Sequence, residues 1–191
     1  MNGWELPRAA VLGGVKYDIN GDYRDILEIF TYLEDPELPV FFRWQIALAL
    51  FYQKPIPPEH QQQAMDYLAE FITGGRAEKA TSGGSLLDWQ QDAPLIVADI
   101  NRVAGREIRA LPFVHWWTFL AWFHAVGEGQ LSGVVAIRDK LRRGKPLEPW
   151  EKTFYREHRQ IVELPKRRTR EEQEQIRSLE RLLDGKGGEK E

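Results

Sequence analysis

The chain of 191 residues contains no cysteine. Disulfide scaffolds, thiol nucleophiles and thiolate metal sites are therefore excluded. The first residues, MNGWELPRAAV, also lack the basic region, apolar run and small-residue cleavage site of a signal peptide, so we expect a cytoplasmic protein. A hydrophobic content of 42% beside a charged content of 29% is typical of a folded domain with an ordinary core.

The sequence also lacks an apolar run long enough to span a membrane. Its most hydrophobic stretch is FVHWWTFLAWFHAV at 113–126, which holds three Trp and no formal charge. As a helix this stretch extends about 21 Å, whereas the hydrocarbon core of a bilayer is about 30 Å thick. Charged residues flank it on both sides. We therefore expect no membrane association.

The net charge of −3 is unevenly distributed. Residues 1–137 hold 10 Lys and Arg against 17 Asp and Glu, residues 138–170 hold 12 against 5, and residues 171–191 hold 4 against 7. Such a dipolar chain suits nucleic acid, binding between copies of itself, or a basic helix pair packed on an acidic body. We favour the last of these interpretations.

Strand signals are confined to the N-terminal region. In AAVLGGVKYDIN at 9–20, Val15, Tyr17 and Ile19 alternate with polar residues, which is the pattern of a half-buried strand. Gly13 and Gly14 supply the positive φ angles of a tight hairpin turn. We predict a small β-hairpin here.

The remainder of the chain is predicted to be helical. Apolar residues recur at helical spacing after Asp22, after Pro39, and over 59–72, 86–104, 113–126, 131–143, from Pro149, and over 169–183. Two starts are open for the fourth helix: Ser85 as a cap with Asp88 three residues on, or Asp92 as a cap. The fold class is mainly α, a helical bundle-like domain of about seven to eight helices with an N-terminal hairpin.

We divide the chain into an α-helical domain over 1–164, with a mobile Gly- and Ser-rich loop at 74–85, and a charged helix and tail over 165–191. The last helix opens with a capping box at Thr169. Its apolar side is a narrow stripe that fits a coiled-coil seam or a partner's groove. A helix lying lightly on its own domain explains it equally well. The stripe consists of Ile176, Leu179, Leu182 and Leu183.

Chemistry-bearing clusters are weak. Asp88, Asp92 and Asp99 share one side of the predicted fourth helix, where they suit a divalent cation, but helix capping and an ion pair with Arg102 explain them more simply. A phosphate-binding loop and an oriented serine–histidine pair are not legible. We expect no enzymatic activity, no cofactor and no metal.

Two basic runs, RDKLRRGK at 138–145 and PKRRTR at 165–170, are the candidates for nucleic-acid binding. Specific readers usually combine such runs with exposed aromatics or a groove-binding helix, and neither is visible. Cations near a helix C-terminus are also favoured by the helix dipole. Nucleic acid is therefore an improbable partner.

The Trp-rich segment is predicted to be a central helix. Its apolar residues lie nearly all round, so neighbouring helices must cover it. An aromatic content of 12% suggests that one side stays uncovered until a partner arrives. Candidate partner-binding residues, from this segment and from the last helix, are Trp116, Trp117, Phe119, Trp122, Phe123, Ile176, Leu179 and Leu183.

Four motifs resemble a known bacteriophage family. They are VKYDINGDYRDIL at 15–27, DWQQDAPLIVADI at 88–100 followed by Gly105, HWWTFLAWF at 115–123, and AIRDK at 136–140. By their order and spacing, the chain is identified up to about Leu164 as a member of the gene-product-fifteen family of phages and prophages. The family-motif residues are Tyr17, Asp22, Asp88, Trp89, Asp92, His115, Trp116, Trp117 and Arg138.

The resemblance implies a place in a phage tail module, in a gene just before that of the tape-measure protein. Long-tailed phages encode their tail assembly chaperones there. The implied function is a non-enzymatic chaperone in the host bacterial cytoplasm that binds the tape-measure protein, with the major tail protein and further copies of itself as possible partners. The alternatives are a structural tail or neck component retained in the virion and a nucleic-acid-binding accessory protein.

Overall fold

The computed structural model describes residues 4–75, 85–165 and 172. Within these residues the chain forms one hairpin, eight α-helices and two 3₁₀ turns. In chain order they are β1 (Ala9–Leu12), β2 (Val15–Asp18), α1 (Tyr23–Leu33), α2 (Val40–Phe51), η1 (Pro58–His60), α3 (Gln61–Ile72), α4 (Ala93–Ala104), η2 (Ile108–Ala110), α5 (Trp116–His124), α6 (Gln130–Arg142), α7 (Pro149–Glu157) and α8 (Arg159–Val162). The expected mainly α fold with an N-terminal hairpin is confirmed.

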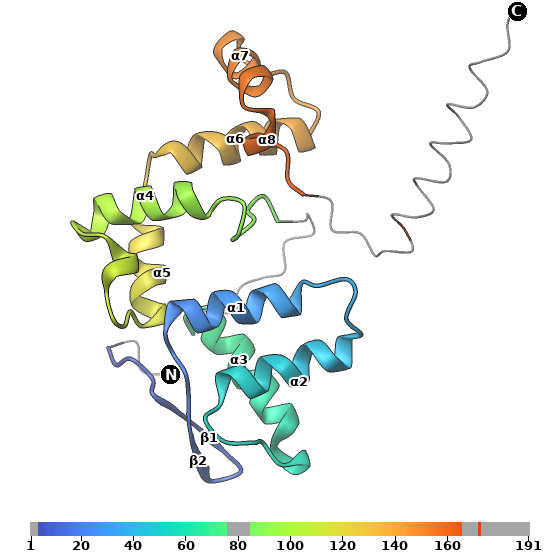
Figure 1. Ribbon diagram of the computed structural model, residues 1–191, viewed down its shortest axis with the longest axis vertical. Helices are drawn as coiled ribbons and strands as arrows, with labels where there is room; N and C mark the ends of the chain where they lie inside the picture. Colours follow the sequence, from blue (N-terminus) through green and yellow to red (C-terminus); the bar gives the residue numbers. More distant parts are fainter. Residues whose placement is uncertain (1–3, 76–84, 166–171, 173–191) are drawn as a thin grey trace, which may run out of the picture.

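The helices are arranged along an elongated molecule. Figure 1 shows the hairpin and α1–α3 at one end, α4 and α5 in the middle, and α6–α8 at the other end. A continuous core extends from the hairpin through α1, α2 and α3 to α4 and α5. The end built from α6, α7 and α8 has fewer buried apolar side chains, of which Val134, Ile137 and Val162 are examples.

The hairpin follows its sequence pattern. Its strands are antiparallel, Tyr17 faces Ala10 across the ladder, and both residues are buried. Gly13 and Gly14 have φ angles of +54° and +83°, so both adopt the left-handed region that a two-residue primed turn requires. The hydroxyl of Tyr67 on α3 donates to the carbonyl of Ala9 at 3.0 Å and fixes the hairpin to the helices.

The start of α4 settles the two alternatives left by the sequence. The helix begins at Ala93 with Asp92 in the N-cap position, so the predicted helix over 86–104 is too long. The carboxylate of Asp92 does not cap the helix, however, because it points to Arg138. Ser85 bonds locally to Leu87 instead of opening a long helix.

The Trp-rich helix is shorter than predicted. Helix α5 begins at Trp116, and the extended residues before it place His115 at the N-cap. Its buried side carries Trp116 and Phe119, whereas Ala121 and His124 are exposed. Helices α1 and α4 pack against α5, and the end of α3 accepts the indole N–H groups of Trp116 and Trp117. Neighbouring helices therefore cover part of α5, and one side of it stays exposed, as the sequence suggested.

The last two described helices replace the single predicted one. Helix α7 begins at Pro149, as predicted, but the chain breaks at His158, with φ −121° and ψ +35°, before α8. The carbonyls of Ile161 and Val162 in α8 accept hydrogen bonds from the side chains of Gln91 and Arg138. Tertiary contacts therefore stabilise the break. Such a break carries no local sequence signal.

The predicted loop at 74–85 and the C-terminal helix over 169–183 fall mostly outside the described residues. The same holds for the stripe residues Ile176, Leu179 and Leu183. Glu172 is described and is helical. In the described parts of the chain, no helix combines the length and the apolar character needed to cross a bilayer.

Candidate functional site

The predicted partner-binding residues of α5 divide into two groups. Trp116 and Phe119 are 1% exposed and stack on each other with ring centroids 5.4 Å apart. Their burial makes them core residues, out of a partner's reach in this conformation. Trp117, Trp122 and Phe123 are half-buried and present part of their surface. A partner role for these three stays a prediction.

The tryptophans of this region build an internal aromatic cluster. Trp89 packs against Phe30 on α1 and against Trp116, Phe119 and Phe123 on α5, with centroid distances between 5.4 and 6.2 Å. Such contacts add about 0.5–1.5 kcal/mol per pair beyond the burial of area. Most of the aromatic richness of the sequence here therefore serves the core.

The side of α5 away from this cluster borders a shallow pocket of about 340 Å³. Trp117, Leu120 and Ala121 line it together with Thr73 and Gly74 at the end of α3. The indole N–H of Trp117 donates to the carbonyl of Phe71 at 2.9 Å, which holds the ring against α3. This pocket is a modest apolar surface with a fixed shape.

A larger apolar groove lies at the other end of the molecule, between α4, α6, α7 and α8. We call it the α6–α8 groove. Its volume is about 590 Å³. The lining residues, which are mostly apolar, are Leu95, Gly129, Gln130, Gly133, Val134, Ile137, Trp150, Phe154, His158 and Ile161. Trp150 is 61% exposed although it faces this groove, so a large aromatic ring stands at its edge.

Gly133 on α6 lines the α6–α8 groove. Because it has no side chain, its backbone forms what we call the floor of the groove. A Cβ built on Gly133 meets no atom within 4 Å, so the described fold gives no steric reason for glycine at this position. Glycine inside a helix costs about 1 kcal/mol relative to alanine. A bare backbone at the floor of a groove lets another chain approach closely.

Helix α7 forms one wall of the groove and is fixed to α6 by an ion pair. The ammonium of Lys140 lies 2.7 Å from both carboxylate oxygens of Glu151, which is buried. The Lys140 contact lowers the pKa of Glu151, and the backbone N–H of Glu148 adds a further bond. The wall is therefore positioned by charge and leaves its apolar side, with Trp150 and Phe154, toward the groove.

A buried ion pair positions α6 and α8, on the other side of the groove from α7. Arg138 on α6 donates from both terminal nitrogens to the two oxygens of Asp92, at 2.7 and 2.8 Å, and Asp92 is 0% exposed. The remaining donors of Arg138 bind the carbonyls of Leu86, Ile161 and Val162. All five guanidinium N–H groups are thereby used. One side chain joins the start of α4, helix α6 and the end of α8.

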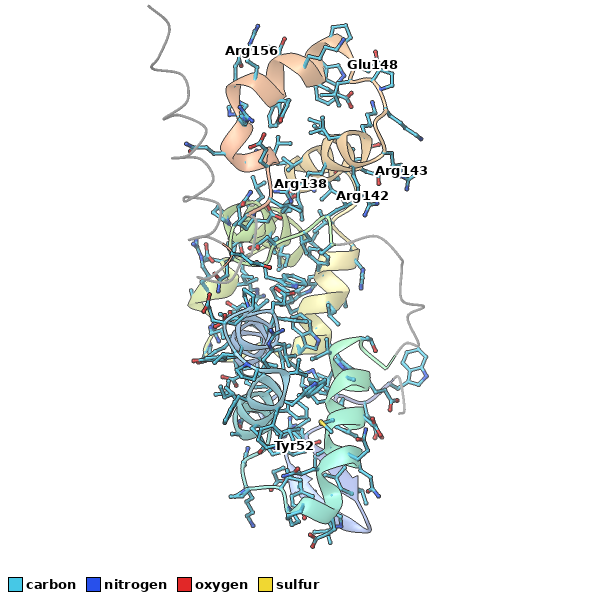
Figure 2. All side chains as sticks on the ribbon, turned by 90° about the vertical axis from the view of Figure 1, so that its right-hand side faces the viewer. Tyr52, Arg138, Arg142, Arg143, Glu148 and Arg156 are labelled. Atoms are coloured by element: carbon cyan, nitrogen blue, oxygen red, sulfur yellow. The ribbon has the colours of Figure 1, made fainter. Side chains whose placement is uncertain are left out.

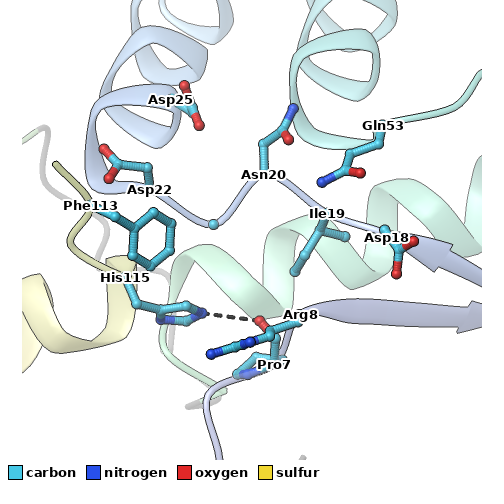
Figure 3. Close-up of a pocket in the computed structure, with 11 residues that line it drawn as sticks. Pro7, Arg8, Asp18, Ile19, Asn20, Asp22, Asp25, Gln53, Phe113 and His115 are labelled. Carbon is cyan, nitrogen blue, oxygen red and sulfur yellow. Dashed lines mark hydrogen bonds between the residues drawn. The ribbon is translucent and has the colours of Figure 1, made fainter.

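A polar pocket of about 570 Å³ lies beside the hairpin. Figure 3 shows His115 at its edge, with the ring nitrogen Nε2 directed to the carbonyl of Pro7 at 3.0 Å. The other ring nitrogen accepts the N–H of Trp117 at 3.1 Å and caps α5. Both nitrogens of this imidazole thus serve the fold, and Asn20 in the same pocket binds the carbonyl of Leu50. His115 and Asn20 in this pocket therefore hold neighbouring segments of the fold together.

The family assignment follows from comparison with known proteins. The family described as bacteriophage Gp15 protein matches residues 5–164. The chain belongs to this family. Neither the curated proteins nor the solved structures gave a match. The match ends shortly after α8 of this Gp15-family chain, so it includes both walls of the α6–α8 groove.

The family-motif residues of this Gp15 protein lie at joints between elements. Asp22 caps α1 through the N–H of Arg24 at 3.0 Å and accepts the N–H of Val114 at 2.9 Å, which ties α1 to the segment before α5. The hydroxyl of Tyr17 lies 3.0 Å from Nδ1 of His60 and ties the hairpin to the turn before α3. These motifs therefore specify the fold.

Asp88, Asp92 and Asp99, which the sequence suggested weakly as a cation site, also form hydrogen bonds and ion pairs that stabilise the fold. Asp88 accepts the N–H groups of Gln90 and Gln91, and Asp92 binds Arg138. Asp99 accepts the N–H of Leu131 at 3.2 Å and lies 3.7 Å from Arg102. Among the described residues, no group of three potential ligands is arranged for a metal ion.

The basic run 138–145 is partly neutralised within the protein. Arg138 is buried against Asp92, and Lys140 is paired with Glu151. Arg142 and Arg143 both approach Asp139, at 2.8 and 3.0 Å. Figure 2 shows Arg142, Arg143 and Arg156 at the end of the molecule formed by α6 and α7. These pairs weaken the case for phosphate binding through this run.

The environment of His115 predicts a pH dependence of stability. Burial lowers its pKa, and the charge of Arg8 acts in the same direction. In the unfolded chain the imidazole takes up a proton near its ordinary pKa of 6.5, whereas in the folded protein it does so only at lower pH. Between these two pH values the unfolded state therefore binds more protons than the folded state. Stability is therefore fully present above pH 6.5 and is lost as pH falls through the interval between the two values.

We expect His115→Asn, which keeps an acceptor for the N–H of Trp117 without titrating, to lose less unfolding free energy than the wild type between about pH 7 and pH 5.5. Urea denaturation at several pH values measures this difference. Equal slopes for the two proteins in that interval would contradict a buried, neutral His115.

The groove is the feature that the sequence interpretation missed. The signal was present, because Trp150, Phe154 and Ile161 share one side of the predicted seventh helix, and Val134 lies on the apolar stripe of the sixth. Neither stripe shows from sequence that the two are separated by an open space. A second missed surface is the first turn of α2, where Val40, Phe41 and Phe42 are exposed.

Proposed function

We propose that this Gp15-family protein is a non-enzymatic tail assembly chaperone that binds the tape-measure protein in the host cytoplasm. The observation that carries the proposal is the α6–α8 groove, an apolar channel bordered by the exposed ring of Trp150 and floored by Gly133. Family membership adds support, because the resemblance implies that the gene of this protein lies just before that of the tape-measure protein. The client is a long helical chain that must be kept from aggregating.

The shape and chemistry of the groove fit a helical client. An amphipathic helix lays its apolar side chains, spaced at i, i+3, i+4 and i+7, into a groove of this kind. The apolar lining and the bare backbone at Gly133 favour close packing of such a stripe, and His158 and Gln130 offer polar contacts at its margin. Many copies binding weakly along one client give avidity and still permit release.

The groove is tested by filling it. We expect Gly133→Leu to reduce binding of a tape-measure segment at least about tenfold, because the new side chain occupies the floor of the groove. The same change should leave the fold intact or stabilise it, because the added Cβ meets no atom and glycine is the poorer helix former. Titration of a labelled tape-measure segment against each variant, with unfolding in urea, measures both effects.

Ala136→Leu is the matched control, since Ala136 is an exposed residue of α6 outside the groove. It should bind the segment like the wild type. Unchanged binding in Gly133→Leu would remove the groove as the client site, and an absence of binding in the wild type would remove the function itself. Mass spectrometry of purified virions separates a chaperone, which should be missing, from a retained tail component.

A further inference from the structure

We infer that the α6–α8 groove of the free protein is occupied by the chain's own acidic C-terminal segment, residues 171–184, which the client must displace. The claim that the segment regulates client binding rests on the proposed function. The claim that the segment occupies the groove does not depend on the client.

The first support is the pattern of the segment. EEQEQIRSLERLLD at 171–184 has one apolar stripe, Ile176, Leu179, Leu182 and Leu183, on an otherwise charged sequence. A stripe of this width is too narrow to be buried all round and suits a groove. As a helix the segment is about 21 Å long, a length that places three or four anchors along one face.

The second support is charge. Residues 138–165, which supply α7, α8 and the last five residues of α6, hold eight Lys and Arg against five Asp and Glu, and one of the eight, Arg138, is buried against Asp92. The segment 171–184 holds five Asp and Glu against two Arg. The groove lining itself holds no Lys or Arg, but the helices that form it and the segment have opposite net charges, which favours this pairing over a basic partner helix.

The third support is connectivity. Ile161 on α8 lines the groove, and the described chain continues from α8 to Pro165. Residues 166–170 reach at most about 18 Å, which keeps the segment beside the groove that its own α8 borders. A short linker of this kind holds a segment at an effective concentration on the order of millimolar, above that of any separate copy.

The absence of cysteine permits a direct test in the full-length protein. In the double variant Gly133→Cys with Leu179→Cys, mild oxidation should form a disulfide within one chain, with a yield about tenfold above two controls. One control moves the first cysteine to the exposed Ala136, and the other moves the second to Glu174, opposite the stripe on the predicted helix. Non-reducing electrophoresis and peptide mapping measure the yield.

Yields equal to either control would overturn the inference. A cross-linked dimer would also overturn it, because the segment would then occupy the groove of another copy. If Gly133→Cys disturbs the fold, Trp150→Cys probes the exposed edge of the same groove with the same partner cysteine. If the cross-link fails but the client still binds, the proposed function stands and this inference falls. If the cross-link forms but the client does not bind, only the proposed function is removed.

Hydrogen exchange supplies a second readout that leaves the groove residues unchanged. In the variant Leu179→Glu with Leu183→Glu, we expect amides of α7 to exchange several-fold faster than in the wild type, because the segment no longer covers that wall. Amides of α1 and α3, which lie at the far end of the molecule, serve as the internal reference (Figure 1). Unchanged exchange in α7 would contradict the inference.

Discussion

Replacing Arg138 by leucine is expected to lower the free energy of unfolding by about 3–5 kcal/mol, the range measured when one partner of a buried ion pair is removed. Arg138 is 4% exposed and Asp92 is fully buried, so the variant leaves an uncompensated carboxylate in the interior. The carbonyls of Leu86, Ile161 and Val162 lose their donors as well. Urea denaturation of the variant and the wild type measures the loss.

A double-mutant cycle identifies the cause. Asp92→Leu should be similarly harmful alone, but adding it to Arg138→Leu should cost little more, because the two charges disappear together. Arg138→Lys should also destabilise, since a lysine cannot replace the five-donor fork that spans Asp92 and three carbonyls. A loss below about 1 kcal/mol in Arg138→Leu would show that water or another cation satisfies Asp92.

The same pair connects the family motifs to the groove. Arg138 binds the carbonyls of Ile161 and Val162 and so fixes the end of α8, whose Ile161 lines the groove. The amide of Gln91, within the DWQQDAP motif, adds bonds to the carbonyls of Gln160 and Glu163. Residues outside the groove lining thereby position α8, which borders the surface that we assign to the client.

The elements that local chemistry determines were predictable from the sequence. Asp22 caps α1, and Gly13 and Gly14 form the hairpin turn, because each depends on neighbours a few residues away. Pro149 begins α7 for the same reason. The eight-helix outcome agrees with the predicted count, although α8 takes the place of the C-terminal helix, which lies outside the described residues.

The features that long-range pairing determines were not predictable. Asp92 and Arg138 are 46 residues apart, and nothing in either local sequence indicates a bidentate contact. Asp92 was one of the two caps that the sequence left open, and it stands at the cap position with its side chain turned elsewhere. The α6–α8 groove is less visible still, because a space between two apolar stripes has no sequence signature.

Trp116→Ala is expected to lower the free energy of unfolding by about 3–5 kcal/mol, as for other large-to-small changes of buried aromatics. The ring of Trp116 is almost fully buried between Phe30, Trp89 and Phe119, so truncation opens a cavity at the centre of the aromatic cluster. Its indole N–H donates to the carbonyl of Ile72 at 2.8 Å, and that acceptor loses its partner. Chemical denaturation gives the value directly.

Trp150→Ala is the comparison that separates stability from binding. Because the described fold leaves Trp150 61% exposed, its removal should lower the free energy of unfolding by no more than about 1 kcal/mol, which allows for lost contacts with the C-terminal segment. The same change should weaken client binding about tenfold, because exposed aromatics at the edge of a groove are typical anchors. A large stability loss in Trp150→Ala, or a small one in Trp116→Ala, would reverse the assignment of core and surface tryptophans. The aromatic richness of the sequence would then have to be divided differently between fold and partner.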